Sequence, residues 1–375
     1  MLCMLRRITA SVFAVLLMCN TAFAEMSRSA CLMNMVTGEI VYEKNSRQRL
    51  PMASTTKIVT ALTAILNSDP DDIVTVSQNA VMQEGSSAYL EPGAALTMRD
   101  ALYGLMLNSG NDAAVAVAEN VSGSVEKFAE EMTSLARKAG AKNTIFKNPN
   151  GLHDENHYTT AEDLALLTRY AMQNEELKKI VSSTEYMAKM TLADGTVKNV
   201  QYINHNKLLR MYEGCIGVKT GFTKAAGRCL VSAAERGGAA YIAVTLNDAD
   251  DWKDHTEMLD SAFDSVRKIT AVKKGDSLRH IVSGNSQCEL IAAEDFIIPV
   301  NGRKAKNAEV RLNIPKDLSP PLNKGEKVGF AEIYCEDIRI GTIDVTADRD
   351  FYAQGEVKSK PCFVSVFKRL LRGVL

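Results

Sequence analysis

The spacing of apolar residues changes at Cys215, and this change restricts the possible folds more than any other feature of the chain. Before it, apolar residues recur mostly every three or four positions, as in helices that bury one face. After it come three runs typical of strands: CIGVKTGFT, RCLVSAAE and AYIAVTLN. Arg236-Gly237-Gly238 separates the last two runs and is a hairpin signal. Another pair of short strands is predicted over residues 30–42, around a turn at Thr37-Gly38.

Helices are expected between these strand regions. The segment 96–107 is predicted as a helix with Thr97 as its N-cap and Asp100 in its first turn. Further helices are predicted over residues 112–120, 125–139, 160–172 and 254–268. We therefore expect an antiparallel sheet, made by the first hairpin and the last three strands, with helices covering it. This α/β (α+β) unit is assigned to residues 25–271.

The chain changes character again near residue 272. Short alternating runs follow, broken by prolines and glycines: FIIPV, AEVRLNIP, VGFAEIYCED and IRIGTIDVTA. Such a pattern predicts a small all-β domain, either a sandwich or a barrel, which we assign to residues 272–360.

Both ends of the chain have the composition expected of targeting segments. Residues 1–24 are predicted as an export signal, since Arg6 and Arg7 precede an apolar stretch and Ala22-Phe23-Ala24 forms a cleavage site. The alternative is an uncleaved anchor, although the apolar stretch is short for a membrane span. Residues 361–375 form an amphipathic segment with cations on one face, which predicts a helix lying on the membrane surface; an ordinary packed terminal helix is the alternative. We expect an exported protein at the outer face of the cytoplasmic membrane, in the periplasm or cell wall.

Charge and cysteine content exclude several classes of function. The chain has 44 Lys and Arg against 45 Asp and Glu, with no dense basic run, so nucleic-acid binding is not expected. The cysteines are scattered without C-x-x-C spacing, which argues against a metal site. No cofactor is expected.

Ser54 and Lys57 stand three residues apart at the start of an apolar stretch, LPMASTTKIVTALTAIL. On a helix this spacing puts both side chains on one face, with the serine at the positive end of the helix dipole. A lysine withdrawn from water has a lowered pKa, so its neutral amine can take the serine proton. Taken alone, the pattern is equally consistent with an N-cap serine beside a lysine that extends to solvent.

Two more elements favour the catalytic interpretation. Ser109-Gly110-Asn111 interrupts two apolar helices, and Lys219-Thr220-Gly221 lies within a predicted strand, where a small residue permits close approach. The order S-x-x-K, S-x-N, K-T-G resembles the motif set of penicillin-binding proteins and class A β-lactamases. The segments LMLNSGNDAAVAVAE, NPNGLHDENHYTTAEDLALL, NHNKLL and GVKTGFTKAAGRCLVSAA narrow the resemblance to the low-molecular-mass penicillin-binding proteins, the D-alanyl-D-alanine carboxypeptidases of the S11 type.

This resemblance implies a β-lactamase/transpeptidase-like catalytic domain and a serine D-Ala-D-Ala carboxypeptidase. Its partners would be peptidoglycan stem peptides and β-lactam antibiotics. It implies that Ser54 is the nucleophile, Lys57 its base and Ser109 a proton relay to the leaving D-alanine. The substrate-binding residues that it implies are Asn111, Lys219, Thr220, Gly221, Phe222 and Thr223, with backbone N–H groups of Ser54 and Phe222 forming the oxyanion hole.

Some positions depart from the family pattern. The resemblance assigns the terminal carboxylate to Thr220 and Thr223. His205 stands where some members carry arginine, and residues 247–254 are acidic where some relatives hold a cation. These departures imply weaker binding of the substrate carboxylate there, or its binding by another residue such as Arg228. His157 and His205 are candidates for substrate contact, although a structural role is the expectation for both. A β-lactamase is disfavoured because S-G-N replaces S-D-N and no E-x-x-L-N segment is found between Asn111 and Lys219. A non-catalytic wall-binding protein is disfavoured because all three motifs are intact.

Overall fold

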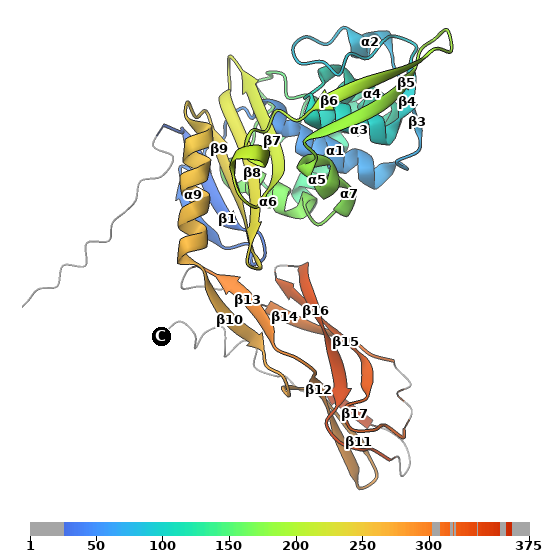
Figure 1. The fold of residues 1–375 in the computed structure, drawn as a ribbon, viewed down its shortest axis with the longest axis vertical. Coiled ribbons are helices and arrows are strands. Elements are labelled where there is room, and N and C mark those ends of the chain that lie inside the picture. The colour runs from blue at the N-terminus through green and yellow to red at the C-terminus, as the bar shows by residue number, and fades with distance from the viewer. Residues whose placement is uncertain are drawn as a thin grey trace, which may run out of the picture.

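The computed structural model describes residues 26–301, 308–315, 318, 320–335, 337–352 and 358–361. The expected export signal, and the amphipathic segment beyond Pro361, lie outside the described residues. Figure 1 shows two parts, an α/β part that extends to residue 265 and a β-rich part below it that begins at residue 267. In the portion of the chain that the structure describes, no helix has the length and apolar character needed to cross a membrane.

The α/β part is built on a five-stranded antiparallel sheet with the order β2-β1-β9-β8-β7. Its strands are β1 (Ser29–Asn34), β2 (Ile40–Lys44), β7 (Cys215–Thr223), β8 (Gly227–Arg236) and β9 (Ala239–Leu246). This confirms that the first hairpin and the three late strands are neighbours. The K-T-G sequence therefore lies on β7, an edge strand of the sheet.

The predicted helices are present with small shifts: α3 (Met98–Leu107), α4 (Asn111–Ser122), α5 (Val125–Lys138), α6 (Ala161–Ala171) and α9 (Asp251–Ser265). The Thr97 side chain caps α3 by accepting from Asp100 N, as expected. Helix α9 begins three residues before its predicted start at 254, because acidic residues suit the positive end of a helix. Its predicted end was also too late, because the chain enters a strand at Arg267.

Several elements were not predicted, most of them between residues 173 and 214. These are β3 (Ile73–Thr75), α2 (Gln78–Val81), β4 (Ala95–Thr97), α7 (Glu175–Ser182), β5 (Glu185–Thr191), β6 (Val197–Ile203) and α8 (Leu208–Met211). The strands among them form a second sheet of order β3-β4-β5-β6. Its β5–β6 hairpin extends beyond the helices at the upper right of Figure 1.

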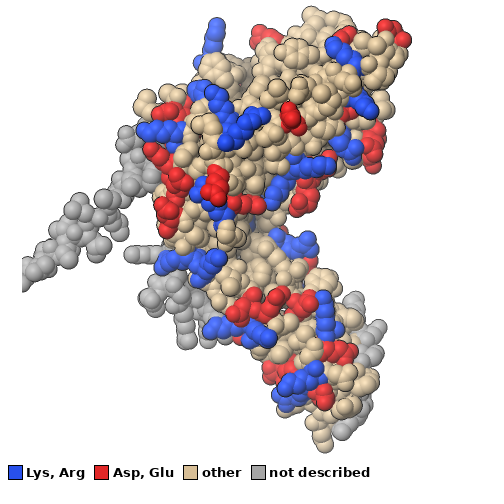
Figure 2. All heavy atoms as spheres, in the orientation of Figure 1, with Lys and Arg blue, Asp and Glu red and all other residues tan. Residues whose placement is uncertain are grey.

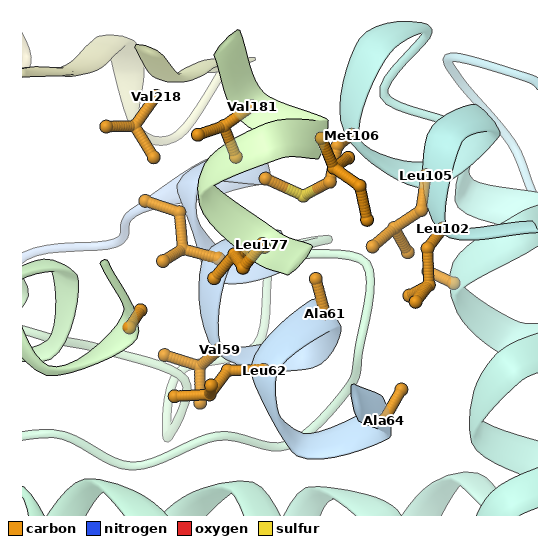
Figure 3. Close-up of a cluster of buried hydrophobic side chains, with 14 of the residues drawn as sticks. Val59, Ala61, Leu62, Ala64, Leu102, Leu105, Met106, Leu177, Val181 and Val218 are labelled. Carbon is orange, nitrogen blue, oxygen red and sulfur yellow. The ribbon is translucent and has the colours of Figure 1, made fainter. Parts of the chain in front are cut away.

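Helix α1 (Lys57–Asn67) runs through the centre of the α/β core, directly after a 3₁₀ turn, η1 (Ala53–Thr56). All residues from Lys57 to Ala64 are buried. Figure 3 shows Val59 and Leu62 of α1 among apolar side chains from α3, α7 and β7, such as Leu105, Leu177 and Val218. A helix packed on several sides cannot shift without disturbing the core, so it is a rigid support for the residues at its start.

The described residues of the β-rich part form two sheets. A two-stranded sheet joins β10 (Arg267–Val272) to β13 (Phe296–Val300). A six-stranded sheet has the order β14-β15-β16-β12-β11-β17. Its strands are β11 (Ser277–Ser283), β12 (Ser286–Ala292), β14 (Ala308–Asn313), β15 (Lys327–Cys335), β16 (Ile338–Ala347) and β17 (Lys358–Pro361). This confirms the expected all-β C-terminal domain, which has its own apolar core.

The two parts meet at a buried polar junction. Arg169 of α6 is only 1% exposed, and its guanidinium donates to Met35 O at 2.8 Å, Val36 O at 2.8 Å and Cys335 O at 3.2 Å. The Asn34 amide donates to Pro299 O at 3.1 Å. Elsewhere, acidic and basic side chains are interspersed on the face shown in Figure 2, in keeping with a formal net charge of −1.

Candidate active site

Ser54 lies in η1, and Lys57 is the first residue of α1. Because the 3₁₀ turn continues into the helix, the two side chains lie on the same side, and Lys57 Nζ is 3.0 Å from Ser54 Oγ. Ala53, just before the serine, has a φ of +49°, a left-handed conformation that a residue with a Cβ rarely adopts. The turn that presents Ser54 is therefore strained, as is common at functional sites.

The amine of Lys57 is fully buried and has two further oxygen partners. Nζ lies 2.7 Å from Asn111 Oδ1 and 2.6 Å from the backbone oxygen of Asn150. Burial is the main reason why the pKa of Lys57 is well below its usual value, and the charge of Lys219 lowers it further. The carboxylate of Asp112 acts in the opposite direction. Burial and Lys219 together thus shift the Lys57 amine toward its neutral form.

The S-G-N sequence forms the link between α3 and α4. Ser109 is buried and has a φ of +59°, and Asn111 is the first residue of α4. The Asn111 amide is held at both ends: Oδ1 accepts from Lys57, while Nδ2 donates to Glu84 O at 2.5 Å. This orients the amide oxygen toward the amine.

Strand β7 brings the K-T-G sequence against the serine turn. A Cβ at Gly221 would lie 3.0 Å from Ser54 N and 3.1 Å from Thr55 N, so the small residue permits this close approach. Lys219 is buried, donates from Nζ to Thr220 O at 3.0 Å, and has its pKa lowered to about 7 by burial. A second basic side chain thus lies close enough to influence Lys57.

Other expected site residues are Phe222 and Thr223, at the end of β7, and His205. Phe222 is exposed, and Thr223 Oγ1 accepts from Ala226 N at 3.0 Å. Burial and the charge of Lys219 lower the pKa of His205, which places His205 within electrostatic range of that lysine.

Arg228 is already engaged with α9. Its guanidinium contacts the buried Asp251 carboxylate through two hydrogen bonds, of 2.6 and 3.2 Å, and lies over the Trp252 ring. Its side chain remains 43% exposed. A substrate carboxylate at this position would compete with Asp251 for the guanidinium.

Sequence reasoning missed two contributions of the 148–151 turn. Asn150 supplies a backbone oxygen to Lys57, which no side-chain motif can reveal. Gly151 has a φ of +88°, and a Cβ there would lie 2.0 Å from Ala53 O, so this turn packs backbone to backbone against the turn of Ser54. The N-P-N-G sequence was the only available signal, because it marks a tight turn.

His157 lies behind this turn and is buried. Lys147 N donates to His157 Nδ1 at 3.0 Å, so Nε2 carries the proton and donates to Thr56 Oγ1 at 2.8 Å. Burial lowers the pKa of His157 to about 4, which keeps the ring neutral. The ring thus links Thr56 of η1 to the backbone at Lys147, and both nitrogens are used in bonds within the protein, in line with the expected structural role. Within the described ranges, no three His, Cys, Asp or Glu side chains are arranged to hold a metal ion.

Comparison with known proteins identifies the family. Residues 19–250, more than half of the chain, match the Peptidase S11 family, which is described as D-alanyl-D-alanine carboxypeptidase. The chain belongs to peptidase family S11. Residues 267–353 also match the C-terminal domain of penicillin-binding protein 5, which agrees with the start of the β-rich part at β10.

Individual S11 relatives agree in sequence and in structure. The D-alanyl-D-alanine carboxypeptidase DacF of Bacillus subtilis is 32% identical over 364 residues, covering 94% of this chain and 91% of that protein. The Streptomyces K15 DD-transpeptidase structure is 33% identical with a TM-score of 0.62, covering 64% of this chain and 97% of that one. The structure of DacD from Francisella tularensis is 26% identical with a TM-score of 0.62, covering 88% of this chain and 94% of that one.

Proposed function

We propose that the chain is a serine D-Ala-D-Ala carboxypeptidase that removes the terminal D-alanine from peptidoglycan stem peptides and is acylated by penicillins. Membership of family S11 supports the activity. The observation that carries the chemistry is the placing of the buried Lys57 amine 3.0 Å from Ser54 Oγ.

The partners of Lys57 explain how it can act as a base. A neutral amine has two N–H groups and one lone pair. The oxygens of Asn111 and Asn150 can accept both N–H groups, which leaves the lone pair directed at Ser54. Ser54 O–H then donates to Nζ, and the proton is already on the path that it follows when Oγ attacks a carbonyl carbon.

The reaction would proceed in two stages. Ser54 Oγ bonds to the carbonyl carbon of the penultimate D-alanine, and its proton passes to Lys57. The carbon–nitrogen bond then breaks, and Ser109 relays the proton held by Lys57 to the departing amine of the terminal D-alanine. Water next attacks the ester carbon, the bond from that carbon to Ser54 Oγ breaks, and a proton from the water returns to Oγ, which releases the shortened peptide and regenerates Ser54. The developing negative oxygen would be held by the N–H groups of Ser54 and Phe222, and removal of one such donor typically costs about 10²–10³ in rate.

Substrate binding is assigned to the residues around β7. Lys219 would supply positive charge, and Thr220 and Thr223 would bind the terminal carboxylate. Gly221 would allow the peptide to lie close to the strand, while Asn111 would contact the substrate amide. His205 near Lys219 and the half-exposed Arg228 are further candidates for the carboxylate, and the Asp251 pairing predicts only a modest contribution from Arg228.

The remaining sequence predictions become proposals about location and organisation. We propose that residues 1–24 direct export and that residues 361–375 rest on the outer face of the cytoplasmic membrane. The predicted division at residue 272 falls within the β10–β13 sheet region, since β10 runs from Arg267 to Val272. The β-rich domain would connect the catalytic domain to that membrane segment.

The test measures both the peptidase reaction and the covalent adduct. Purified protein and a Ser54→Ala variant are incubated with a D-Ala-D-Ala peptide and, separately, with a fluorescent penicillin. Mass spectrometry should show release of D-alanine and a long-lived penicilloyl adduct on Ser54, both absent from the variant. Failure to release D-alanine, together with labelling that survives Ser54→Ala, would refute the proposal. Rapid turnover of penicillin would instead indicate a β-lactamase.

A further inference from the structure

Asp112 is buried within the first turn of α4, and its carboxylate holds a loop that is distant in sequence. Ser87 Oγ donates to Oδ2 at 2.6 Å, Ala88 N donates to Oδ1 at 2.8 Å, and Leu90 N donates to Oδ2 at 3.1 Å. The Asp112 side chain thus anchors the 84–90 loop at residues 87, 88 and 90.

Asn111 also holds this loop, but through hydrogen bonds that Asn111 donates and the loop carbonyls accept. Asn111 N donates to Ser86 O at 2.7 Å, and Asn111 Nδ2 donates to Glu84 O at 2.5 Å. Gly85 lies between these carbonyls, and a Cβ there would be 3.0 Å from Asn111 Nδ2. The loop therefore fits tightly over the Asn111 amide, and its position depends on both neighbouring residues of α4.

The Glu84 carbonyl decides which end of the Asn111 amide meets Lys57. A carbonyl oxygen can only accept, so it pairs with Nδ2 and leaves Oδ1 facing Lys57 Nζ at 2.7 Å. In the reversed orientation the amide N–H groups would face the N–H groups of the lysine. If the loop moved away, the contact that selects the productive orientation would be lost, and with it the direction of the lysine lone pair.

We propose that Asp112 is a positioning residue for the acylation of Ser54, acting through the 84–90 loop on the Asn111 amide and so on Lys57. The inference rests on the proposed function, because it concerns the same reaction. Asp112 itself need not contact the substrate.

The first experiment compares acylation rates by fluorescent penicillin with thermal unfolding. Asp112→Asn places an amide nitrogen among N–H donors and should slow acylation by about 10- to 100-fold. Ser87→Ala removes the bond from Ser87 Oγ to Asp112 and the bond that Ser87 Oγ accepts from Tyr89 N, without altering the core, and should slow acylation about fivefold. The control is Asp100→Asn, since Asp100 is also a buried helix carboxylate but accepts from Thr97 and Tyr186. It should lower the unfolding temperature and leave the acylation rate of the folded protein unchanged.

A double-mutant cycle then separates positioning from general destabilisation. If Asp112 acts through Asn111, Asp112→Asn should slow acylation in the wild-type background but have little further effect once Asn111→Ala is present. Asp100→Asn should leave the acylation rate unchanged in both backgrounds, while its loss of thermal stability adds to that of Asn111→Ala. Additive effects of Asp112→Asn and Asn111→Ala, or wild-type acylation by both Asp112→Asn and Ser87→Ala, would overturn the inference. Absence of Ser54 acylation in the wild-type protein would instead refute the proposed function, so the two failures are distinguishable.

Discussion

Replacement of Gly151 by alanine should impair the reaction far more than it impairs stability. The new Cβ would lie 2.0 Å from Ala53 O and 2.5 Å from Ala53 C. These are backbone atoms that cannot rotate away. To reach even 3.0 Å from the oxygen, the two turns must separate by about 1 Å, and a misplacement of that size at a reacting group can cost about 100-fold in rate.

Gly195 offers a matched control in the turn between β5 and β6. Its φ of +87° is nearly the same as the +88° of Gly151, but a Cβ there would meet nothing within 4 Å. Both Gly→Ala variants should therefore lose about 1–2 kcal/mol of stability from the left-handed backbone alone. Each kcal/mol lowers Tm by about 2–4 °C in a domain of this size.

The assay is acylation by a fluorescent penicillin at a temperature where all three proteins are folded, with Tm measured in parallel. Gly195→Ala should acylate at the wild-type rate. Gly151→Ala should acylate about 100-fold more slowly and unfold at a lower temperature than Gly195→Ala. Wild-type acylation by Gly151→Ala, or an equal loss in both variants, would show that contact with the Ser54 turn does not govern the reaction.

Three further predictions concern buried charged and titratable groups. Lys219→Met removes a charge that lowers the pKa of Lys57, so the acid limb of the acylation pH profile should move to higher pH. Arg169→Met leaves three backbone carbonyls without a charged donor and should lower the free energy of unfolding by about 3 kcal/mol, measured by urea denaturation. The folded pKa of His157 is about 4, below the usual 6.5, so the unfolded state binds more protons between these values. Stability should therefore fall by up to about 3 kcal/mol as pH drops from 6.5 to 4, and His157→Gln should reduce this dependence in urea titrations at several pH values.

The sequence predicted those parts of the site that depend on side-chain identity at short spacing. Ser54 and Lys57 are three residues apart, and the helix geometry that brings them together is local. Contacts made by backbone atoms carry no such signal: the Asn150 carbonyl that holds Lys57, and the Glu84 carbonyl that orients Asn111, depend on loops that only the folded chain brings near.

The same distinction applies to the fold: elements with clear local sequence signals were predicted, and elements without them were missed. The antiparallel sheet was predictable because β7, β8 and β9 follow one another with clear turn signals. The β5–β6 hairpin was missed although its Asp194-Gly195 turn is a recognisable signal, because its outer faces carry many polar residues and no continuous apolar run. Helix α7, which packs on α1 beside the site, was missed because it is short and half of its residues are charged.

The junction between the two parts of the molecule bears on how such proteins can be recombined. Arg169 and Asn34 donate across this junction to the main-chain oxygens of Cys335 and Pro299, and these two bonds do not depend on the side chains of the acceptor residues. Side chains of the β-rich part also cross: Asn301 accepts from the Tyr241 hydroxyl and donates to Ala262 O, and Cys335 Sγ donates to Thr37 O. A β-rich domain taken from another S11 peptidase should therefore dock if its backbone follows the same path and it carries equivalent groups at positions 301 and 335. Exchange of whole domains would then be constrained by chain geometry together with the residues at these positions.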